Sequence, residues 1–142
     1  MSNLKKIEIR KYKVIKKSKG KILKFFSSKD KNYFGFGEIY ISLISSKEIR
    51  AWKYHENLYM NLFVIKGKIK FVFYCPRLKK IKVIIMTDKM RQKLTVPPKI
   101  WYGFKNLSTT GSSIMNVTNI IHNKKKIKNK PKDFINFNWK KD

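Results

Sequence analysis

Three side chains that can transfer protons lie in two short segments of the chain. Lys53 and His55 are two residues apart in the segment 49–55, and Tyr102 lies in the segment 100–104. Both segments are apolar and aromatic enough to be strands, and residues two apart on a strand share a face. A neutral amine removes protons, a phenol donates them and an imidazole does either. Lys53, His55 and Tyr102 are therefore candidate catalytic residues.

Each of the three residues also has an ordinary structural interpretation. Lys53 would then be a solvated lysine at the rim of the domain, and His55 an interior histidine satisfied by a hydrogen bond. Tyr102 would bury its ring and leave its hydroxyl at the surface. Parity along the strand places Arg50 on the face opposite to Lys53 unless a β-bulge intervenes.

The rest of the sequence supplies the strands that must hold these side chains. Short apolar stretches alternate with turns, and Gly35 and Gly37 lie where a strand bends or another backbone approaches closely. So many short strands favour an all-β sandwich or barrel. We expect strands at 5–15, 34–44, 49–55, 58–65, 68–74, 81–86, 91–96, 100–104 and 113–121, with a further apolar run at 21–26.

A length of 142 residues suits one compact domain, 1–142. Its lysine-rich segment 122–142 should pack the aromatic residues of 134–139 back on the domain, with His122 exposed. The single cysteine, Cys75, excludes an internal disulfide and suits a core position. No apolar run reaches the roughly 18 residues of a membrane span, so we expect a cytoplasmic protein without membrane insertion.

The net charge of +27 comes almost entirely from lysine. Only four of the 35 cationic residues are arginines, namely Arg10, Arg50, Arg77 and Arg91. Proteins that read bases favour arginine, whose planar fork binds in a bidentate manner. Lysines spread in ones and twos indicate a diffuse solvated coat that attracts anions generally. Specific nucleic-acid binding is therefore not expected, whereas a phosphate-bearing small molecule remains a suitable partner.

Two stretches keep the spacing of the signature motifs of the cupin, or jelly-roll, β-barrel. The first motif has two histidines, a glutamate and a glycine, and these positions hold Lys53, His55, Met60 and Gly67. The second has the pattern Pro-x-Gly-x-x-His-x-x-x-Asn, which here reads Pro97, Lys99, Tyr102 and Asn106. The turn residues remain, but most metal ligands are replaced. The resemblance implies an all-β barrel with no metal or other cofactor.

Several segments resemble a narrower family, the dTDP-4-dehydrorhamnose 3,5-epimerases and related nucleotide-sugar cupins. Residues 96–104 with Leu107 and Ser108 are similar to its Ile-Pro-x-Gly-x-x-His-Gly-Phe-x-x-Leu segment, and 50–53 to its Arg-Gly-x-His. Residues 36–40 match a Phe-Gly-Glu-x-Tyr phrase of one branch, and 135–139 resemble the closing aromatic phrase. The likeness covers residues 15–139.

The resemblance implies proton removal beside the ketone of a nucleotide-linked 4-keto sugar, in surface-polysaccharide biosynthesis. Lys53 then occupies the position of the base, Met115 that of the tyrosine acid, and Tyr102 that of a histidine. Arg50 and Arg77 are expected to hold the diphosphate. Asn61 and Trp139 are further expected substrate-binding residues, and the protein is expected to be a homodimer that binds a dTDP-sugar. Because a methionine cannot transfer protons, the alternative is a catalytically silent cupin that binds a nucleotide sugar or scaffolds a partner.

Overall fold

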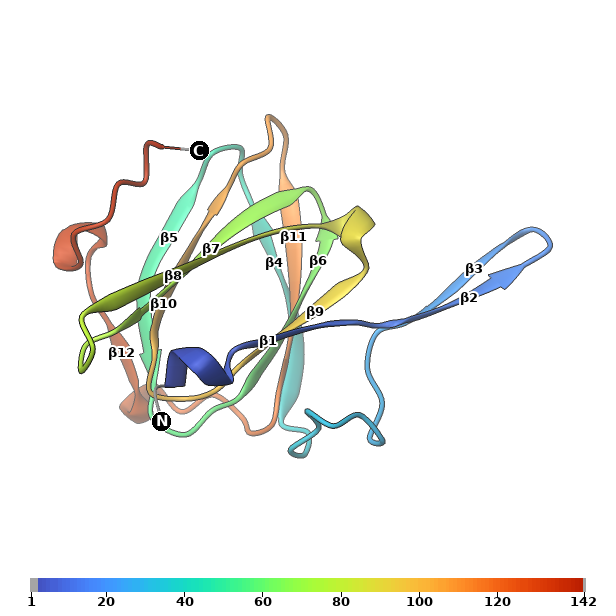
Figure 1. Ribbon diagram of the computed structural model, residues 1–142, viewed down its shortest axis with the longest axis horizontal. Coiled ribbons are helices and arrows are strands. Elements are labelled where there is room, and N and C mark those ends of the chain that lie inside the picture. The colour runs from blue at the N-terminus through green and yellow to red at the C-terminus, as the bar shows by residue number, and fades with distance from the viewer. Residues whose placement is uncertain (1–2, 142) are drawn as a thin grey trace.

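The computed structural model of the protein describes residues 3–141, which form two five-stranded antiparallel sheets folded together as a barrel (Figure 1). The first sheet has the order β1 (Glu8–Lys11), β9 (Gln92–Val96), β6 (Met60–Lys66), β11 (Ser112–Thr118) and β4 (Glu38–Ile44). The second has the order β12 (Ile127–Asn129), β5 (Ile49–His55), β10 (Trp101–Asn106), β7 (Lys68–Cys75) and β8 (Lys80–Thr87). The helical residues are single 3₁₀ turns at Asn3–Lys6, Asp88–Met90, Lys124–Lys126 and Lys132–Phe134. The all-β prediction is confirmed.

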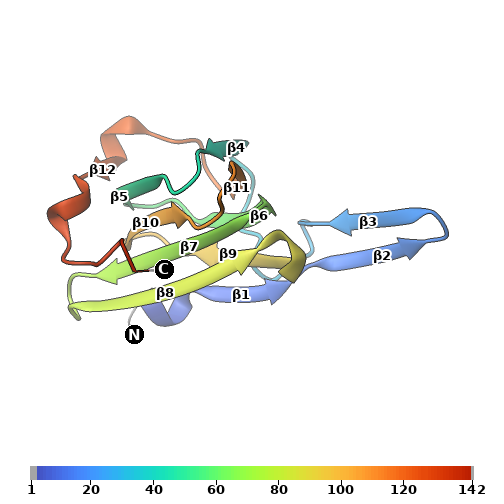
Figure 2. The ribbon, with the colours of Figure 1, turned by 90° about the horizontal axis from the view of Figure 1, so that it is seen from above.

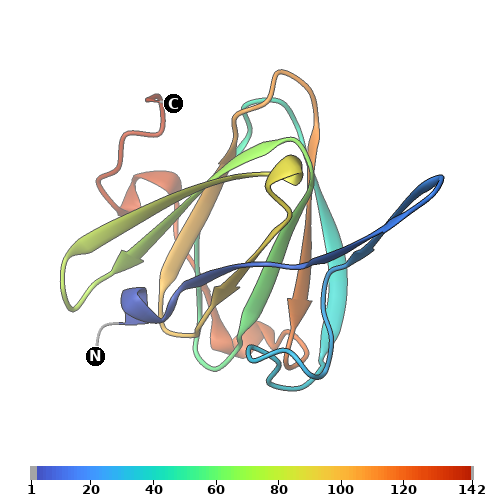
Figure 3. The same ribbon diagram turned by 45° about the vertical axis from the view of Figure 1, so that its right-hand side comes forward.

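The expected strand at 5–15 is wrong in one respect, because it divides between two sheets. β1 pairs with β9, whereas β2 (Lys13–Lys17) pairs only with β3 (Gly20–Lys24) in a separate two-stranded sheet. At the break, the Tyr12 amide donates to the Arg91 carbonyl. The β2–β3 hairpin then projects from the barrel as an arm, as the views in Figure 2 and Figure 3 agree.

The barrel interior holds the main hydrophobic core, because every second residue of its strands is large and apolar. Phe71 and Phe73 of β7 are fully buried, as are Ile69 and Leu94. Cys75 is buried in the same cluster, as expected for a small core residue. Burying side chains of this size contributes roughly 1.5–3 kcal/mol each.

A second hydrophobic cluster lies on the outer face of the second sheet. Trp52 and Trp101 project outward there and are covered by Ile135 and Trp139 of the C-terminal segment. The rings of Trp52 and Trp139 are 5.3 Å apart, and backbone hydrogen bonds join Trp52 to Lys130 in both directions. The C-terminal segment thus braces β5 from behind.

The motif residues Gly67 and Asn106 have structural roles at one end of the barrel. Gly67 has a φ of 99°, and a β-carbon there would collide with Ser112. The Asn106 amide donates to the carbonyls of Ile44, Ser45 and Thr110, and its oxygen accepts from Ser108 and Ser112. These contacts join three connecting segments, so the motif spacing is retained for the fold.

Candidate functional site

A β-bulge in β5 decides which side chains enter the barrel. Tyr102 of β10 pairs with Lys53, but the next residue, Gly103, pairs with Ala51, so Trp52 is an extra residue in the ladder. The alternation of faces therefore slips by one. Arg50 and Lys53 line the same cavity, and Ala51 borders it while also packing against the outer cluster. The β-bulge that would bring Arg50 to the face of Lys53 is therefore present.

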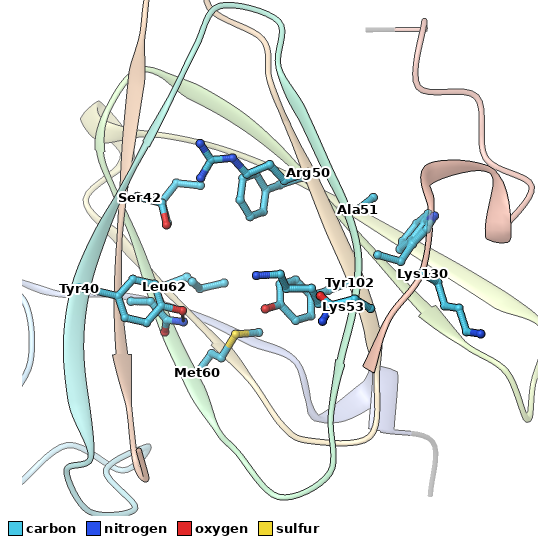
Figure 4. Close-up of a pocket in the computed structure, with 14 residues that line it drawn as sticks. Tyr40, Ser42, Arg50, Ala51, Lys53, Met60, Leu62, Tyr102 and Lys130 are labelled. Atoms are coloured by element: carbon cyan, nitrogen blue, oxygen red, sulfur yellow. Dashed lines mark hydrogen bonds between the residues drawn. The ribbon is translucent and has the colours of Figure 1, made fainter. Parts of the chain in front are cut away.

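The cavity lies between β4 on one side and β5 and β10 on the other, and it has a volume of about 310 Å³ (Figure 4). Arg50, Lys53 and Lys130 line it, and no carboxylate of the described residues does. Apolar side chains cover much of its floor, among them Met60, Leu62, Phe104 and Ile114. A volume near 300 Å³ with a few polar groups is typical of small-molecule sites. The Lys130 side chain points away from the cavity (Figure 4), with its ammonium over the Phe134 ring, so Arg50 and Lys53 are the two cations that favour an anionic ligand.

On the wall of β5 and β10, His55 lies behind Tyr102. The His55 Nε2 is 3.0 Å from the Tyr102 hydroxyl, and the two rings stack. Burial raises the pKa of Tyr102. Burial lowers the pKa of His55 to about 4, with smaller contributions from His122 and Lys53. Near neutral pH, Tyr102 is therefore a protonated phenol beside a neutral imidazole. The His55 Nδ1 is buried and has no hydrogen-bond partner among the described residues.

On the wall of β4, Tyr40 points into the cavity opposite Tyr102 and Lys53 (Figure 4). Its hydroxyl accepts from Asn116 Nδ2 at 2.9 Å and lies 3.4 Å from His122 Nε2. Burial raises the pKa of Tyr40, so it too keeps its proton. Sequence reasoning missed Tyr40 as a site residue, although the Phe-Gly-Glu-x-Tyr phrase contains it.

His122 is not the exposed tail residue that we expected. Its Nδ1 bonds to Glu38 Oε1, its backbone amide donates to the same oxygen at 3.0 Å, and its ring packs against that of His55. The hydrogen bond from His122 lowers the pKa of Glu38. The loop after β11 therefore returns to β4 and fixes His122 between Glu38 and Tyr40.

Met115 does not reach the cavity, so its assignment to the acid position is wrong. On β11, Ile114 and Asn116 line the cavity, and Met115 alternates to the other face. The phenol that faces Lys53 across the cavity comes instead from β4.

Three expected substrate-binding residues lie elsewhere. Asn61 accepts from Thr95 Oγ1 at 2.6 Å and donates to the Asn32 carbonyl, so its amide is used within the fold. Trp139 is buried in the outer cluster. Arg77 lines a separate hollow at the β7–β8 turn with Tyr54 and Lys99. The geometry gives none of the three a place at the cavity.

Arg50 and Lys53 stand at the open edge of the cavity. The Arg50 Nε donates to Glu48 at 2.6 Å, and its Nη2 donates to the Leu43 carbonyl at 2.7 Å. Lys53 is exposed. Within residues 3–141, no group of three or more His, Cys, Asp or Glu side chains is placed to hold a metal ion, and no helix is long and apolar enough to cross a membrane.

Comparison with solved structures relates this architecture to sugar-nucleotide enzymes. A dTDP sugar isomerase from Desulfovibrio desulfuricans G20 matches with a TM-score of 0.89 and 24% identity, over 100% of this chain and 96% of that one. A dTDP-4-dehydrorhamnose 3,5-epimerase from Bacillus anthracis, crystallised with TDP and PPi, matches with a TM-score of 0.81 and 15% identity over 98% and 87%. A mutant of the 3,4-ketoisomerase QdtA from Thermoanaerobacterium thermosaccharolyticum, crystallised with TDP-4-keto-6-deoxyglucose, matches with 0.76 and 17% over 91% and 90%.

No family model and no curated protein matches the sequence. The structural likeness nevertheless extends over the whole chain, and many of the similar structures are dTDP-sugar epimerases or isomerases. The protein therefore has the cupin fold of these enzymes, and the predicted jelly-roll barrel is confirmed.

Proposed function

We propose that the protein enolises a nucleotide-linked 4-keto-6-deoxy sugar and returns the proton from the other face, as an epimerase of surface-polysaccharide biosynthesis in the cytoplasm. One observation carries the proposal. Lys53 and Tyr40 line one cavity from opposite walls, with the Tyr102 hydroxyl beside Lys53. A ketone acidifies the C–H bonds on both neighbouring carbons, so a base on one face and an acid on the other suffice to invert a centre.

The other cavity residues suit the remaining tasks. Tyr102, oriented by His55, donates to the ketone oxygen as negative charge develops on it. Arg50 attracts the diphosphate, and the apolar floor packs against the deoxy sugar. The ligands named for the similar structures, TDP and TDP-4-keto-6-deoxyglucose, support a dTDP-sugar as the substrate.

Deuterium exchange tests this function directly. The protein is incubated with dTDP-4-keto-6-deoxyglucose in D₂O, and NMR follows both deuterium entry beside the ketone and inversion of the centre. We expect Lys53→Ala to abolish exchange, because it removes the base. Tyr40→Phe should retain exchange but slow inversion by about 10²–10⁴-fold, the usual contribution of a general acid. Lys66→Ala, which removes an equal charge from an exposed position, is the matched control.

The same experiment separates the enzyme from the silent cupin. Saturable 1:1 binding of the dTDP-sugar that survives about 0.2 M salt, without deuterium exchange above the buffer rate, would contradict the enzyme hypothesis. It would support the catalytically silent cupin that binds a nucleotide sugar. Tight, sequence-selective nucleic-acid binding at that salt would contradict both.

We also propose that the protein works as a homodimer in which a second copy covers the outer face of β4. Ile39, Ile41 and Leu43 are 53%, 54% and 74% exposed there, although Tyr40, Ser42 and Ile44 of the same strand face inward. The projecting β2–β3 arm is a second unsupported element, and two-stranded hairpins alone are marginal in water. A single interface between two copies related by a two-fold axis would cover both the apolar outer face of β4 and the β2–β3 arm.

Sedimentation velocity of the intact chain tests the dimer. Ile41→Asp should give a monomer, because it places a charge in the proposed contact. Val83→Asp, at a 46% exposed position of β8, should leave the dimer intact. A wild-type monomer at micromolar concentration would contradict the proposal.

A further inference from the structure

A directed chain of polar groups joins the cavity to the outside of the molecule through β4. Glu38 and Tyr40 are two residues apart on this strand, and His122 bridges them with its two ring nitrogens. Tyr40 lines the cavity, whereas the side chains of His122 and Glu38 are 25% and 35% exposed. This series of hydrogen-bonded groups therefore begins at the candidate reaction centre and ends at solvent.

The hydrogen-bond directions follow from the groups themselves. Glu38 Oε1 can only accept, so His122 Nδ1 carries a proton, and the backbone amide of His122 donates to the same oxygen. His122 Nε2 then faces the Tyr40 hydroxyl, whose oxygen also accepts from Asn116. With a proton on Nε2, the Tyr40 oxygen accepts from both neighbours and its own hydrogen is directed into the cavity. Without that proton, Nε2 accepts the Tyr40 hydrogen and turns it away.

We propose that His122, held by Glu38, is a positioning residue that aims the Tyr40 hydroxyl at the substrate and restores its proton after each turnover. This inference rests on the proposed function of Tyr40 as the acid. Tyr40 gives its proton to the enolate carbon and becomes a phenolate. The imidazolium then passes its Nε2 proton to the phenolate oxygen, and solvent protonates the imidazole again. The Glu38 carboxylate stabilises the imidazolium throughout.

The groups around His122 favour this role. Glu38 and Tyr40 face it from β4, and His55 faces it from β5. His55 is neutral near pH 7, so Glu38 provides the opposing charge among the ring's direct contacts. The Lys124–Lys126 turn, which follows in the chain, contributes cations on the solvent side. A bound sugar would close the cavity in front of Tyr40, and the route through His122 then supplies protons from behind.

The decisive measurement is the pH dependence of two separate steps. Wild type, His122→Gln and Glu38→Gln are compared for deuterium entry and for inversion of the sugar centre, between about pH 5.5 and 9. We expect entry to be nearly unchanged in both variants and inversion to fall about 10–100-fold in His122→Gln. Wild-type inversion should depend on pH through the Nε2 proton of His122, and His122→Gln should lack that dependence. Glu38→Gln should also slow inversion, because His122 loses the carboxylate that holds its ring. Glu56→Gln, which removes a carboxylate from a surface pair with Lys128, is the matched control and should behave as wild type.

A second readout needs no substrate. In protein labelled with ¹³Cζ-tyrosine, the Tyr40 signal should change with pH through its contact with His122, and that change should vanish in His122→Gln while remaining in Glu56→Gln. If His122→Gln does not fold, Glu38→Gln should reduce the change, because it releases the His122 ring from β4. If no 4-keto sugar is converted, the proposed function fails, and this coupled shift alone decides the relay. An unchanged Tyr40 signal in His122→Gln, or inversion with the wild-type pH dependence, would overturn it.

Discussion

The two walls of the cavity are built differently. On β5 and β10, His55 and Tyr102 bond to each other and are nearly sealed from solvent, and one imidazole nitrogen has no described partner. On β4, Tyr40 belongs to a network in which an amide, an imidazole and a carboxylate continue toward the surface. The His55–Tyr102 pair can keep its protonation state during turnover, whereas Tyr40 can exchange protons with solvent through His122. An acid that must be recharged is therefore better placed on β4.

Acid titration should expose the sealed wall most strongly. Unfolded His55 takes up a proton near pH 6.5, but the folded protein resists protonation until about pH 4. Stability is therefore lost as the pH falls through this window, by about 3 kcal/mol in total. Urea unfolding of wild type and His55→Asn at half-unit pH steps measures it. The stability difference between the two should shrink by that amount from pH 7 to 4, while carboxylates titrate alike in both. A constant difference would show that His55 is not buried in its neutral form.

Gly37→Ala should disturb the β4 wall selectively. A β-carbon at Gly37 would collide with the backbone of Ile120, just before His122. Moving that backbone should cost about 2 kcal/mol, as overpacking does, and should shift the NMR signals of His122 more than those of His55. Gly111→Ala meets only ordinary contacts and should change stability by less than about 0.5 kcal/mol. Equal effects on both histidines would mean that the walls are not independent.

The smallest expected effect is that of Tyr102→Phe on stability. It removes the hydroxyl and leaves the second His55 ring nitrogen without that partner, which should cost about 1 kcal/mol. Thermal unfolding against Tyr40→Phe provides the comparison. Tyr40→Phe should cost about the same, because it leaves the buried Asn116 amide without its acceptor while the 25% exposed His122 can turn to water. A larger loss of stability in Tyr40→Phe than in Tyr102→Phe would contradict the conclusion that the β5–β10 wall is the more sealed of the two.

Most strands were predictable, because alternating apolar residues directly record which face of a sheet is buried. The break at Tyr12 could not be predicted, since β1 and β2 have similar sequences. They differ in their partners, because β1 pairs with β9 and β2 pairs with β3. Gly37 was expected to admit another backbone, and Ile120 is that backbone.

The candidate site divides along the same two walls. Lys53, His55 and Tyr102 could be found because a known motif fixes their spacing within continuous strands. The network of Glu38, Tyr40 and His122 spans about 80 residues of sequence and forms only when the loop after β11 folds back on β4. Arg50 and Met115 show that one extra residue in a strand decides which side chains face the cavity. The bulge at Trp52 turns Arg50 toward the cavity, and regular alternation along β11 turns Met115 away from it.

The outer aromatic cluster determines what an optical probe can report. All three tryptophans of the chain, Trp52, Trp101 and Trp139, lie in it. Intrinsic fluorescence therefore registers the seating of the C-terminal segment against the second sheet, while far-ultraviolet circular dichroism registers the barrel. If the segment detaches before the strands separate, the two signals will show different midpoints, and the chain will not unfold in a single step. Because Trp52 also borders the cavity, a fluorescence change on adding a ligand can report occupancy as well as movement of the C-terminal segment.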